Sequence, residues 1–394
     1  MRQNPYFSTD KRMMPLQGIK VLELGQLIAG PFAGKTLGDF GADVIKVEPP
    51  GTGDPLRQWR LLHEGTSVWW QVQSRNKRSV ALDLRTEAGR TDVMRLIDEA
   101  DVLIENFKPG TLEKWGMGHD VLSARNPGLI MLRISGYGQD GPYRDLPGFA
   151  VVAEAMGGLR HLMGEPDRPP VRAGVSLGDT LAALHGVIGV LLALQARQRT
   201  GRGQVVDVAL YEAVFNCMES LLPEYSAFGA VRQPAGSALP GIAPSNAYRC
   251  ADGQVVIGGN GDSIYKRLMQ AIGREDLGED PELAHNAGRA ARVDAIDAAI
   301  TAWTVQRSVQ DVVNTLQAVS VPVGRIYTVQ DIAEDPHYRA RGMIERITTA
   351  TGLSVDVPGV VPKLSDTPGG LHRPAPALGE HTEEVLGRRF SSPE

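Results

Sequence analysis

The stretch IKVLELGQLIAGPFAGKTLGDFGADVIKVE, residues 19–48, carries the strongest structural signal in the chain. An apolar, strand-like run leads through a glycine-containing turn into a helical segment, and a second strand-like run follows. Pro31 suits the first turn of a helix, because it lacks an N–H group and its φ angle is preset, so we expect the helix to begin there. Similar alternation continues to about residue 135. The pattern predicts a parallel α/β domain with a ligand crevice at the carboxyl ends of its strands.

The turn itself resembles a phosphate-binding loop. AGPFAGKT, residues 29–36, differs from G-x-x-x-x-G-K-[ST] only in having Ala29 where that loop needs its first glycine. If the helix begins at Pro31, however, Gly34 and Lys35 lie inside it, and no strand-borne Asp is evident to hold Mg²⁺. A nucleotide triphosphatase is therefore disfavoured. A tight strand-to-helix turn is the alternative, and it leaves room for another ligand at the helix N-terminus.

The composition is that of an ordinary soluble protein. Of 394 residues, 42% are apolar and 22% are charged, and the net charge of −5 gives no general attraction to nucleic acid. The longest apolar run, VIGVLLAL at 187–194, is too short to cross a bilayer. We therefore expect neither a nucleic acid nor a membrane as partner.

Cysteine and histidine usage points to a reducing compartment and to no metal. Cys217 and Cys250 cannot form a disulfide framework, and the eight histidines include no pair spaced as H-x-x-x-H. Residues 1–12 are polar and lack the apolar core of a secretory signal. These features predict a cytoplasmic protein, whose natural start at Met13 or Met14 is an open alternative.

A long apolar helix is expected over residues 180–198. It would start after Asp179 in GVSLGDT, residues 174–180, and stop before Gly201, and because it is apolar almost all round it should be buried. Asp179 allows two compatible interpretations. It is a helix cap, or it is an ionised carboxylate at the positive helix end, open between glycines and able to attack an activated acyl group.

The rest of the chain suggests a second, smaller domain. Gly, Ala, Pro and Ser crowd residues 228–247, and AYRCADGQVVIGG at 247–259 reads as a hairpin with a D-G turn. We assign 14–200 to a large domain, 201–247 to a linker, 248–335 to a small α+β domain, and 336–394 to a second linker and a return to the large domain.

Six ordered motifs resemble the class III coenzyme A-transferases, and the resemblance extends from Leu16 to Leu386. The motifs are LIAGPFAGKTLGDFGADVIKVEPP, SRNKRSVALDL, ENFKPGTLEKWG, RISGYGQDGPY, GVSLGDTLAALHGVIGVLLALQARQRTGRGQVVDVALYEA and LGEHTEEVL. The resemblance implies a Rossmann-like large domain, an interlocked homodimer, and a CoA thioester as substrate with no permanently bound cofactor. It also implies that Asp179 is the nucleophile, acting through an aspartyl anhydride and an aspartyl–CoA thioester.

The same resemblance implies a CoA site built from loops that follow strands. Its residues are Gln26, Leu27, Ile28, Ala29, Leu82, Asp83, Leu84, Arg85, Asn106, Phe107, Lys108, Lys114, Ser135, Gly136, Tyr137 and Gly138. The CoA phosphates need cations and exposed backbone N–H groups. For Lys77, Arg78 and Arg85, phosphate contact and a solvated basic face remain equal alternatives.

Within the family, the sequence favours the succinyl-CoA:dicarboxylate transferases, which act on acids such as glutarate, itaconate or citramalate. A racemase needs a titratable group beside the α-carbon, and Phe149 stands where that histidine is expected. The loop around Gly236 has fewer glycines than in formyl-CoA transferases, which puts formate or oxalate in doubt; carnitine-type acids remain an alternative. Arg57, Arg75 and Arg172 are equal candidates to hold the second carboxylate of the acceptor.

Two further motifs favour a structural role. Glu380 and His381 resemble the C-terminal signature of the family, yet we interpret them as a helix start, and His119 in GMGHD likewise.

Overall fold

The computed structural model describes residues 13–387, so the predictions about residues 1–12 lie outside the described part of the chain. The chain divides into two compact units. Unit 1 comprises the residues up to Leu159, Ala173–Glu219 and the chain from Pro336, and unit 2 comprises Arg160–Arg172 and Ser220–Asp335.

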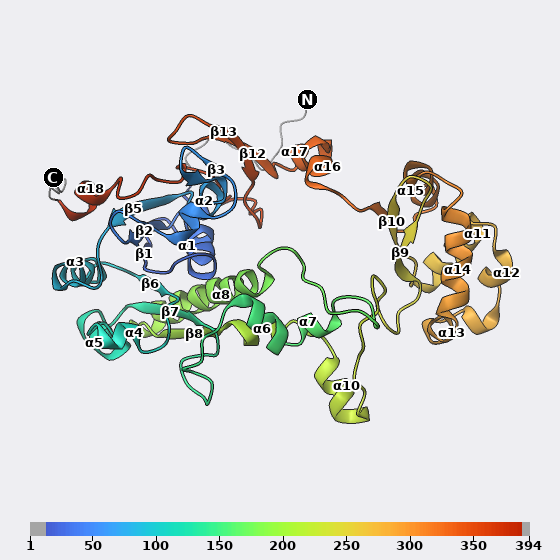
Figure 1. Cartoon of the computed structure of the whole chain (residues 1–394), viewed down its shortest axis with the longest axis horizontal. Helices are drawn as coiled ribbons and strands as arrows, with labels where there is room; N and C mark the ends of the chain where they lie inside the picture. The colour runs from blue at the N-terminus through green and yellow to red at the C-terminus, as the bar shows by residue number, and fades with distance from the viewer. Residues whose placement is uncertain (1–12, 388–394) are drawn as a thin grey trace. The chain divides into compact units, whose positions relative to one another are not determined.

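Unit 1 is built on a six-stranded parallel sheet, which confirms the predicted parallel α/β architecture (Figure 1). The strands are β1 (Lys20–Glu23), β2 (Asp43–Glu48), β5 (Lys77–Ala81), β6 (Val102–Glu105), β7 (Ile130–Ser135) and β8 (Val205–Ala209). Their order in the sheet is β5-β2-β1-β6-β7-β8. From β1 the chain adds strands first on one side of the sheet and then, from β6 onward, on the other. The switch point therefore lies between β1 and β6, and doubly wound sheets bind ligands at such points.

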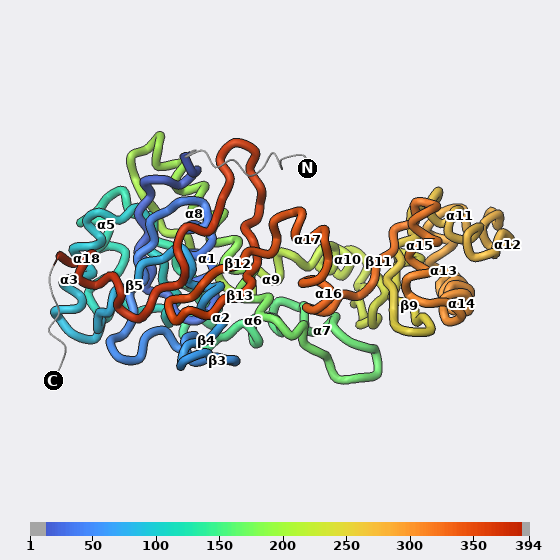
Figure 2. Tube along the Cα trace, turned by 90° about the horizontal axis from the view of Figure 1, so that it is seen from above, coloured from blue at the N-terminus to red at the C-terminus, as the bar shows by residue number. Residues whose placement is uncertain are grey.

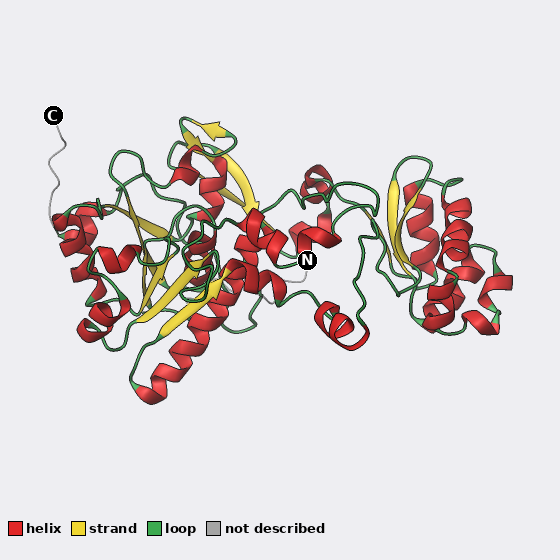
Figure 3. Ribbon diagram, turned by 60° about the horizontal axis from the view of Figure 1, so that its bottom comes forward, coloured by secondary structure: helices red, strands yellow, loops and turns green. Residues whose placement is uncertain are grey.

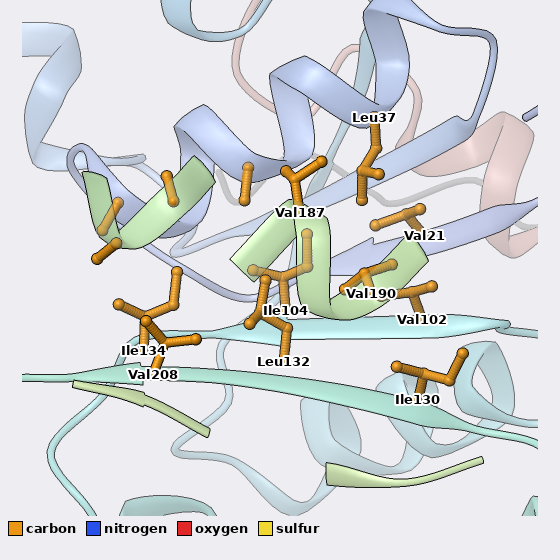
Figure 4. Packing of buried hydrophobic residues seen from close by; sticks show 14 of the residues in the cluster. Val21, Leu37, Val102, Ile104, Ile130, Leu132, Ile134, Val187, Val190 and Val208 are labelled. Atoms are coloured by element: carbon orange, nitrogen blue, oxygen red, sulfur yellow. The ribbon is translucent and has the colours of Figure 1, made fainter. Parts of the chain in front are cut away.

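Helices cover both faces of this sheet. One face packs against α1 (Ala29–Asp39), α6 (Ala150–Met156), α8 (Leu177–Thr200) and α9 (Leu210–Phe215). Figure 4 shows Val187 and Val190 of α8 and Leu37 of α1 over Ile104 and Leu132 of the strands. The other face packs against α3 (Glu87–Ile97), α4 (Thr111–Lys114), α5 (His119–Arg125) and α18 (Thr382–Leu386).

The position and surroundings of α8 differ from the prediction in two ways. The helix begins at Leu177, with Ser176 at the cap position, so Asp179 is its third residue rather than its cap. The helix is long and apolar enough, by length and composition, to cross a membrane, with a mean hydropathy of 1.8. One side packs on the sheet, but the other is exposed in the single chain, so the expectation of burial all round is wrong for this side.

The chain returns to unit 1 after Pro336. It forms α17 (Pro336–Ala340), the hairpin β12 (Ile344–Thr348) and β13 (Ser354–Pro358), and finally α18. The Ala81 N–H donates to Thr382 Oγ1 at 3.0 Å, which ties α18 to the end of β5. Figure 2 shows this C-terminal chain running beside the N-terminal strands. Unit 1 is completed by α2 (Val68–Gln73), the hairpin of β3 (Leu62–His63) and β4 (Thr66–Ser67), and a 3₁₀ turn at Pro55–Gln58.

Unit 2 has its own antiparallel sheet and core. The strands β9 (Ser245–Arg249), β10 (Gln254–Gly258) and β11 (Val323–Arg325) lie in the order β11-β10-β9, and β9 and β10 form the predicted hairpin (Figure 3). Its helices are α10 (Leu221–Phe228), α11 (Asp262–Ala271), α12 (Glu275–Gly278), α13 (Asn286–Ala291), α14 (Val293–Thr304), α15 (Val309–Ala318) and α16 (Val329–Glu334), with a 3₁₀ turn at Pro281–Leu283. The short helix α7 (Leu159–Leu162) lies where the chain passes from unit 1 to unit 2.

Residues 201–247 do not form one continuous linker. They supply the edge strand β8 and the helix α9 to unit 1, and α10 to unit 2. The β-branched run VVDVA at 205–209 pairs with β7, which gives the sheet its sixth strand.

Candidate functional site

The parallel sheet brings the predicted CoA-binding segments to one edge. Gln26–Ala29 follow β1, residues 82–85 follow β5, residues 106–108 follow β6, and Ser135–Gly138 end and follow β7. Because β1, β6 and β7 are neighbours in the sheet, three of these segments are adjacent, whereas the segment after β5 lies two strands beyond β1. The order of strands therefore gathers residues that are far apart in the sequence.

Close packing explains the glycines of the β1–α1 turn. A side chain on Gly25 would lie 3.1 Å from the Gly30 Cα and equally close to Asn106 Oδ1. The Asn106 side chain instead joins the end of β6 to this turn: it accepts the Gln26 N–H at 2.8 Å and donates to the Gln26 carbonyl at 2.9 Å. Gly25 and Gly30 thus make room for Asn106, at the point where the sheet order reverses.

The residues that resemble a phosphate-binding loop also have packing roles. Helix α1 begins at Ala29, two residues earlier than predicted, so Gly34 and Lys35 lie well inside it. A methyl group on Gly34 would stand 1.9 Å from Glu23 Oε2. Lys35 reaches back over the Phe32 ring and pairs with Asp39 at 3.7 Å. Neither residue is placed to cradle a triphosphate.

The three basic residues in and after β5 have different environments. Lys77 is fully buried, where its Nζ lies 2.8 Å from Glu23 Oε2, and burial lowers its pKa to about 8. Arg78 pairs with Asp43 and Glu384. Arg85 pairs with Asp83 at 2.8 Å and is exposed beside the carboxyl edge of the sheet. Only Arg85 of the three both follows its strand at that edge and is open to solvent.

Two of the three arginines predicted to hold the acceptor have interior roles instead. The Arg57 guanidinium donates to both oxygens of Glu48 at 2.8 Å and lies 3.7 Å above the Trp70 ring. Arg75 donates to both oxygens of Asp39, at 2.9 and 2.7 Å. Both guanidinium groups are buried, so binding a substrate would first require breaking these pairs. Arg172 is exposed in unit 2 and stays a prediction.

The first turn of α8 lies next to the loop after β7. A side chain on Gly136 would stand 2.9 Å from the Gly148 Cα, and one on Gly178 would stand 3.2 Å from the Ala150 Cβ. The segment that leads into α6 therefore touches the loop on one side and the start of α8 on the other. Asp179, half-buried in that first turn, is brought to the end of the sheet that carries the predicted CoA residues.

The loop after β7 is held by its own contacts. Ser135 Oγ accepts the Gly138 N–H at 3.0 Å, and Gly138 has a φ of 93°, which glycine adopts without strain. The Tyr137 ring lies 5.9 Å from Tyr143 and 6.3 Å from Tyr211. This part of the sheet edge is lined by aromatic rings, which suit an uncharged part of a ligand better than a phosphate group.

The loop after β6 is suited to anions. Lys108 and Lys114 are exposed, and the Phe107 ring packs edge-on against Trp115 at 5.5 Å. Sequence reasoning missed Arg144, whose guanidinium lies 3.8 Å from the position of a Cβ on Gly110. It also missed Asp54, which binds the β1–α1 turn from beneath. Both follow quoted motifs closely in the sequence, but only the fold shows which groups their side chains approach.

Other singled-out residues have structural places. Phe149 precedes α6 and is 68% exposed, His119 begins α5, and His381 caps α18 while its ring contacts Arg373 at 2.8 Å. Gly236 lies in unit 2 with a φ of 60° and donates to the Gly164 carbonyl. Within residues 13–387, no group of three or more His, Cys, Asp or Glu side chains is placed to hold a metal ion.

Comparison with known proteins identifies the family of this chain. Residues 16–382 match the model of CoA-transferase family III, and the chain belongs to that family. It is 48% identical to succinyl-CoA--D-citramalate CoA-transferase of Chloroflexus aurantiacus over 96% of this chain and 95% of the relative. It is 44% identical to the succinyl-CoA--L-malate CoA-transferase beta subunit of the same organism, over 95% of this chain and 93% of the relative.

A solved structure gives the same answer for the fold. The crystal structure of a CAIB/BAIF family protein from Brucella suis matches with a TM-score of 0.84 and 38% identity, covering 95% of this chain and 99% of that one. The chain is thus a class III CoA-transferase, an enzyme whose substrates are CoA thioesters.

Proposed function

We propose that this enzyme moves CoA from succinyl-CoA to a dicarboxylic acid of the citramalate or malate type. The observation that carries this proposal is the 48% identity, over nearly the full length of both chains, with a transferase of that specificity. A half-buried carboxylate in the first turn of α8 supports it, because such a group can act as a nucleophile toward a thioester.

The proposed reaction exchanges bonds of similar energy and needs no ATP. An Asp179 oxygen attacks the thioester carbonyl of the donor, the C–S bond breaks, and a mixed anhydride and CoA thiolate form. The thiolate then attacks the aspartyl carbonyl, which releases the donor acid and leaves an aspartyl–CoA thioester. The acceptor carboxylate repeats these steps in reverse, so Asp179 is regenerated. The tetrahedral oxyanion of each step would be stabilised by backbone N–H groups near the first turn of α8.

The CoA nucleotide would lie along the carboxyl edge of the sheet. The first N–H groups of α1 have no acceptor inside the helix, and the helix begins in the turn at Gln26–Ala29. Arg85, Lys108 and Lys114 supply positive charge for the phosphates. The tyrosines beside the loop after β7 would flank the pantetheine arm.

We further propose a homodimer in which a second copy covers the outer side of α8, as in the interlocked dimer that the resemblance implies. Its exposed leucines and isoleucine, Leu184, Ile188, Leu191 and Leu192, are 41–66% accessible in the single chain. Such a stripe marks a contact surface. In sedimentation experiments, the wild-type protein should have twice the chain mass and Leu192→Glu should have the mass of one chain. A monomeric wild type, or a dimeric Leu192→Glu, would contradict this proposal.

A transfer assay tests the function. Purified protein receives succinyl-CoA and one acid at a time: D- or L-citramalate, malate, glutarate, itaconate, oxalate or carnitine. New CoA esters are identified by mass, with Asp179→Ala as control. We expect a citramalyl- or malyl-CoA that the variant does not form. No product from any acid would reject the proposal, and exchange of an α-proton without transfer would indicate a racemase.

A further inference from the structure

A buried network of charges lies beneath the β1–α1 turn. It contains Glu23 at the end of β1, Lys46 in β2, Asp54 in the following loop and Lys77 in β5, all at most 1% exposed. None of these residues stands in the loops that the CoA site would use. The network therefore needs an explanation other than direct contact with substrate.

Lys46 is the centre of this network. Its Nζ lies 2.9 Å from Glu23 Oε1, 2.8 Å from Asp54 Oδ2 and 2.7 Å from the Gly25 carbonyl. Three acceptors around one ammonium satisfy its three N–H groups and fix its position. The Asp54 carboxylate is thereby fixed relative to β1.

Asp54 in turn fixes the backbone of Leu27. The Leu27 N–H donates to both Asp54 oxygens, at 3.1 and 3.2 Å. Leu27 has a φ of 64°, a left-handed conformation that a leucine adopts only when its surroundings impose it. The contact with Asp54 is a direct means of imposing it, since a charged acceptor binds an N–H strongly.

Side chains also occupy the carbonyl groups along this turn. The acceptors Gly25, Gln26, Ile28 and Pro31 receive hydrogen bonds from Lys46, Asn106, Gln73 and Lys77, respectively, at 2.7–2.9 Å. Two of these four donors are cations. The turn consequently directs these carbonyl groups toward donors inside the protein, two of them charged, while the first N–H groups of α1 remain for an anion.

We infer that Asp54, oriented by Lys46, is a positioning residue for the acyl-CoA substrate: it holds the Leu27 turn in the conformation that binds CoA before CoA arrives. The inference rests on the proposed placement of CoA at this turn. It predicts that loss of Asp54 weakens CoA binding while chemistry at saturation is preserved, because Asp54 acts through Leu27 and not on the reacting atoms.

Asp54→Asn tests the inference, with Asp39→Asn as the matched control. Asp39 is an equally buried carboxylate paired with an arginine, but it lies at the far end of α1. Calorimetry with free CoA and steady-state kinetics with succinyl-CoA give both readouts. We expect Asp54→Asn to raise the Kd for CoA and the KM at least tenfold, with kcat within about threefold. Asp39→Asn should leave both constants unchanged.

Leu27→Gly shows whether Asp54 acts through the Leu27 backbone. Glycine adopts a φ of 64° without strain, so the turn then depends less on Asp54. In the Leu27→Gly background, Asp54→Asn should therefore raise the Kd for CoA by a clearly smaller factor. An equal factor in both backgrounds would show that Asp54 does not act through Leu27.

Amide hydrogen exchange of the wild-type protein tests whether the Leu27 turn is ordered before CoA binds. Without ligand, the Leu27 amide should exchange slowly, and added CoA should slow only the amides of Ile28, Ala29 and Gly30. Fast exchange at Leu27 that slows on adding CoA would mean that CoA itself orders the turn, which overturns the inference. If wild-type protein and Asp54→Asn bind CoA with equal Kd, the inference fails while the CoA site stands. If wild-type protein does not bind CoA, the proposed placement of CoA fails first.

Discussion

Helices α1 and α8 pack on the same face of one sheet, yet their N-termini are built differently. The first turn of α1 contains no acidic residue and is buried. Lys46 of β2 and Asn106, which follows β6, hold the turn before it, and Lys77 of β5 bonds the Pro31 carbonyl within it. The first turn of α8 carries its own carboxylate, Asp179, and follows the exposed residues Gly174 and Val175. Both ends are positive by the helix dipole.

The difference teaches how one fold can separate binding from reaction. A positive end without its own anion, fixed in advance by its surroundings, suits a phosphate-bearing ligand that must bind without reacting. A positive end with a half-buried carboxylate suits the nucleophilic role that we propose for Asp179. On this view α1 serves the nucleotide of CoA and α8 serves the thioester.

The largest effect should follow from removing the carboxylate at α8. Asp179→Ala should lower kcat for CoA transfer by at least about 10³-fold, since no other group would then form the covalent intermediate. Binding of free CoA should stay within about threefold of wild type, because α1 is untouched. If Asp179→Ala lost CoA binding and CoA transfer in parallel, binding and reaction would not be separated between α1 and α8.

A smaller effect should follow at α1 from Asn106→Ala. The variant loses two hydrogen bonds to Gln26, worth together about 2 kcal/mol, which corresponds to a roughly 30-fold rise in KM for succinyl-CoA. Asn126→Ala is the control, because the Asn126 side chain also bonds backbone groups, the carbonyls of Ile97 and Ala100 and the Gly128 N–H, away from the carboxyl edge. Equal changes in KM for the two variants would contradict a special role of the β1–α1 turn.

Gly34→Ala should reduce stability. Its methyl group would overlap Glu23 Oε2, 1.9 Å away, so we expect a loss of about 1–3 kcal/mol in the free energy of unfolding measured with urea. Gly128→Ala serves as control, because its methyl would meet no atom closer than 3.6 Å. A Gly34→Ala variant of wild-type stability would show that Glu23 is not held against α1.

The pH dependence of stability should report on Lys77. Burial and the nearby Lys46 charge both lower the pKa of its ammonium group. The pKa of Lys77 falls from 10.5 to about 8 in the folded protein, so between these values the unfolded chain binds more protons. The free energy of unfolding therefore rises with pH there, by about 1 kcal/mol from pH 8 to pH 9. The Lys77→Met variant should lack this rise. Identical pH profiles for the wild-type protein and Lys77→Met would show that Lys77 does not cause it.

Much of the fold was predictable because it depends on local patterns. Alternating strand and helix signals predict a parallel sheet, and the rule that ligands bind at the carboxyl ends of such strands brings together residues after β1, β6 and β7. Helix starts were less predictable. Ser176 and Asp179 both belong to residue types that cap helices well, and only the folded backbone shows that α8 begins after the earlier one.

The burial and ion pairing of the charged residues could not be predicted from the sequence. Arg57, Arg75 and Lys77 look like surface cations until the fold places Glu48, Asp39 and Glu23 beside them. Each pair joins residues from separate elements, so no local spacing marks it. For the same reason the sequence does not mark Asp54, although it accepts the Leu27 N–H in the β1–α1 turn.

The most direct test of the account is to locate the covalent intermediate. Trypsin would release residues 173–197 as one peptide, in which Asp179 is the only side-chain carboxylate. Protein treated with succinyl-CoA and then hydroxylamine should yield this peptide with a hydroxamate on Asp179, and protein without succinyl-CoA should not. An unmodified peptide from a preparation that actively transfers CoA, or a hydroxamate on another residue, would contradict the assignment of Asp179 as the nucleophile.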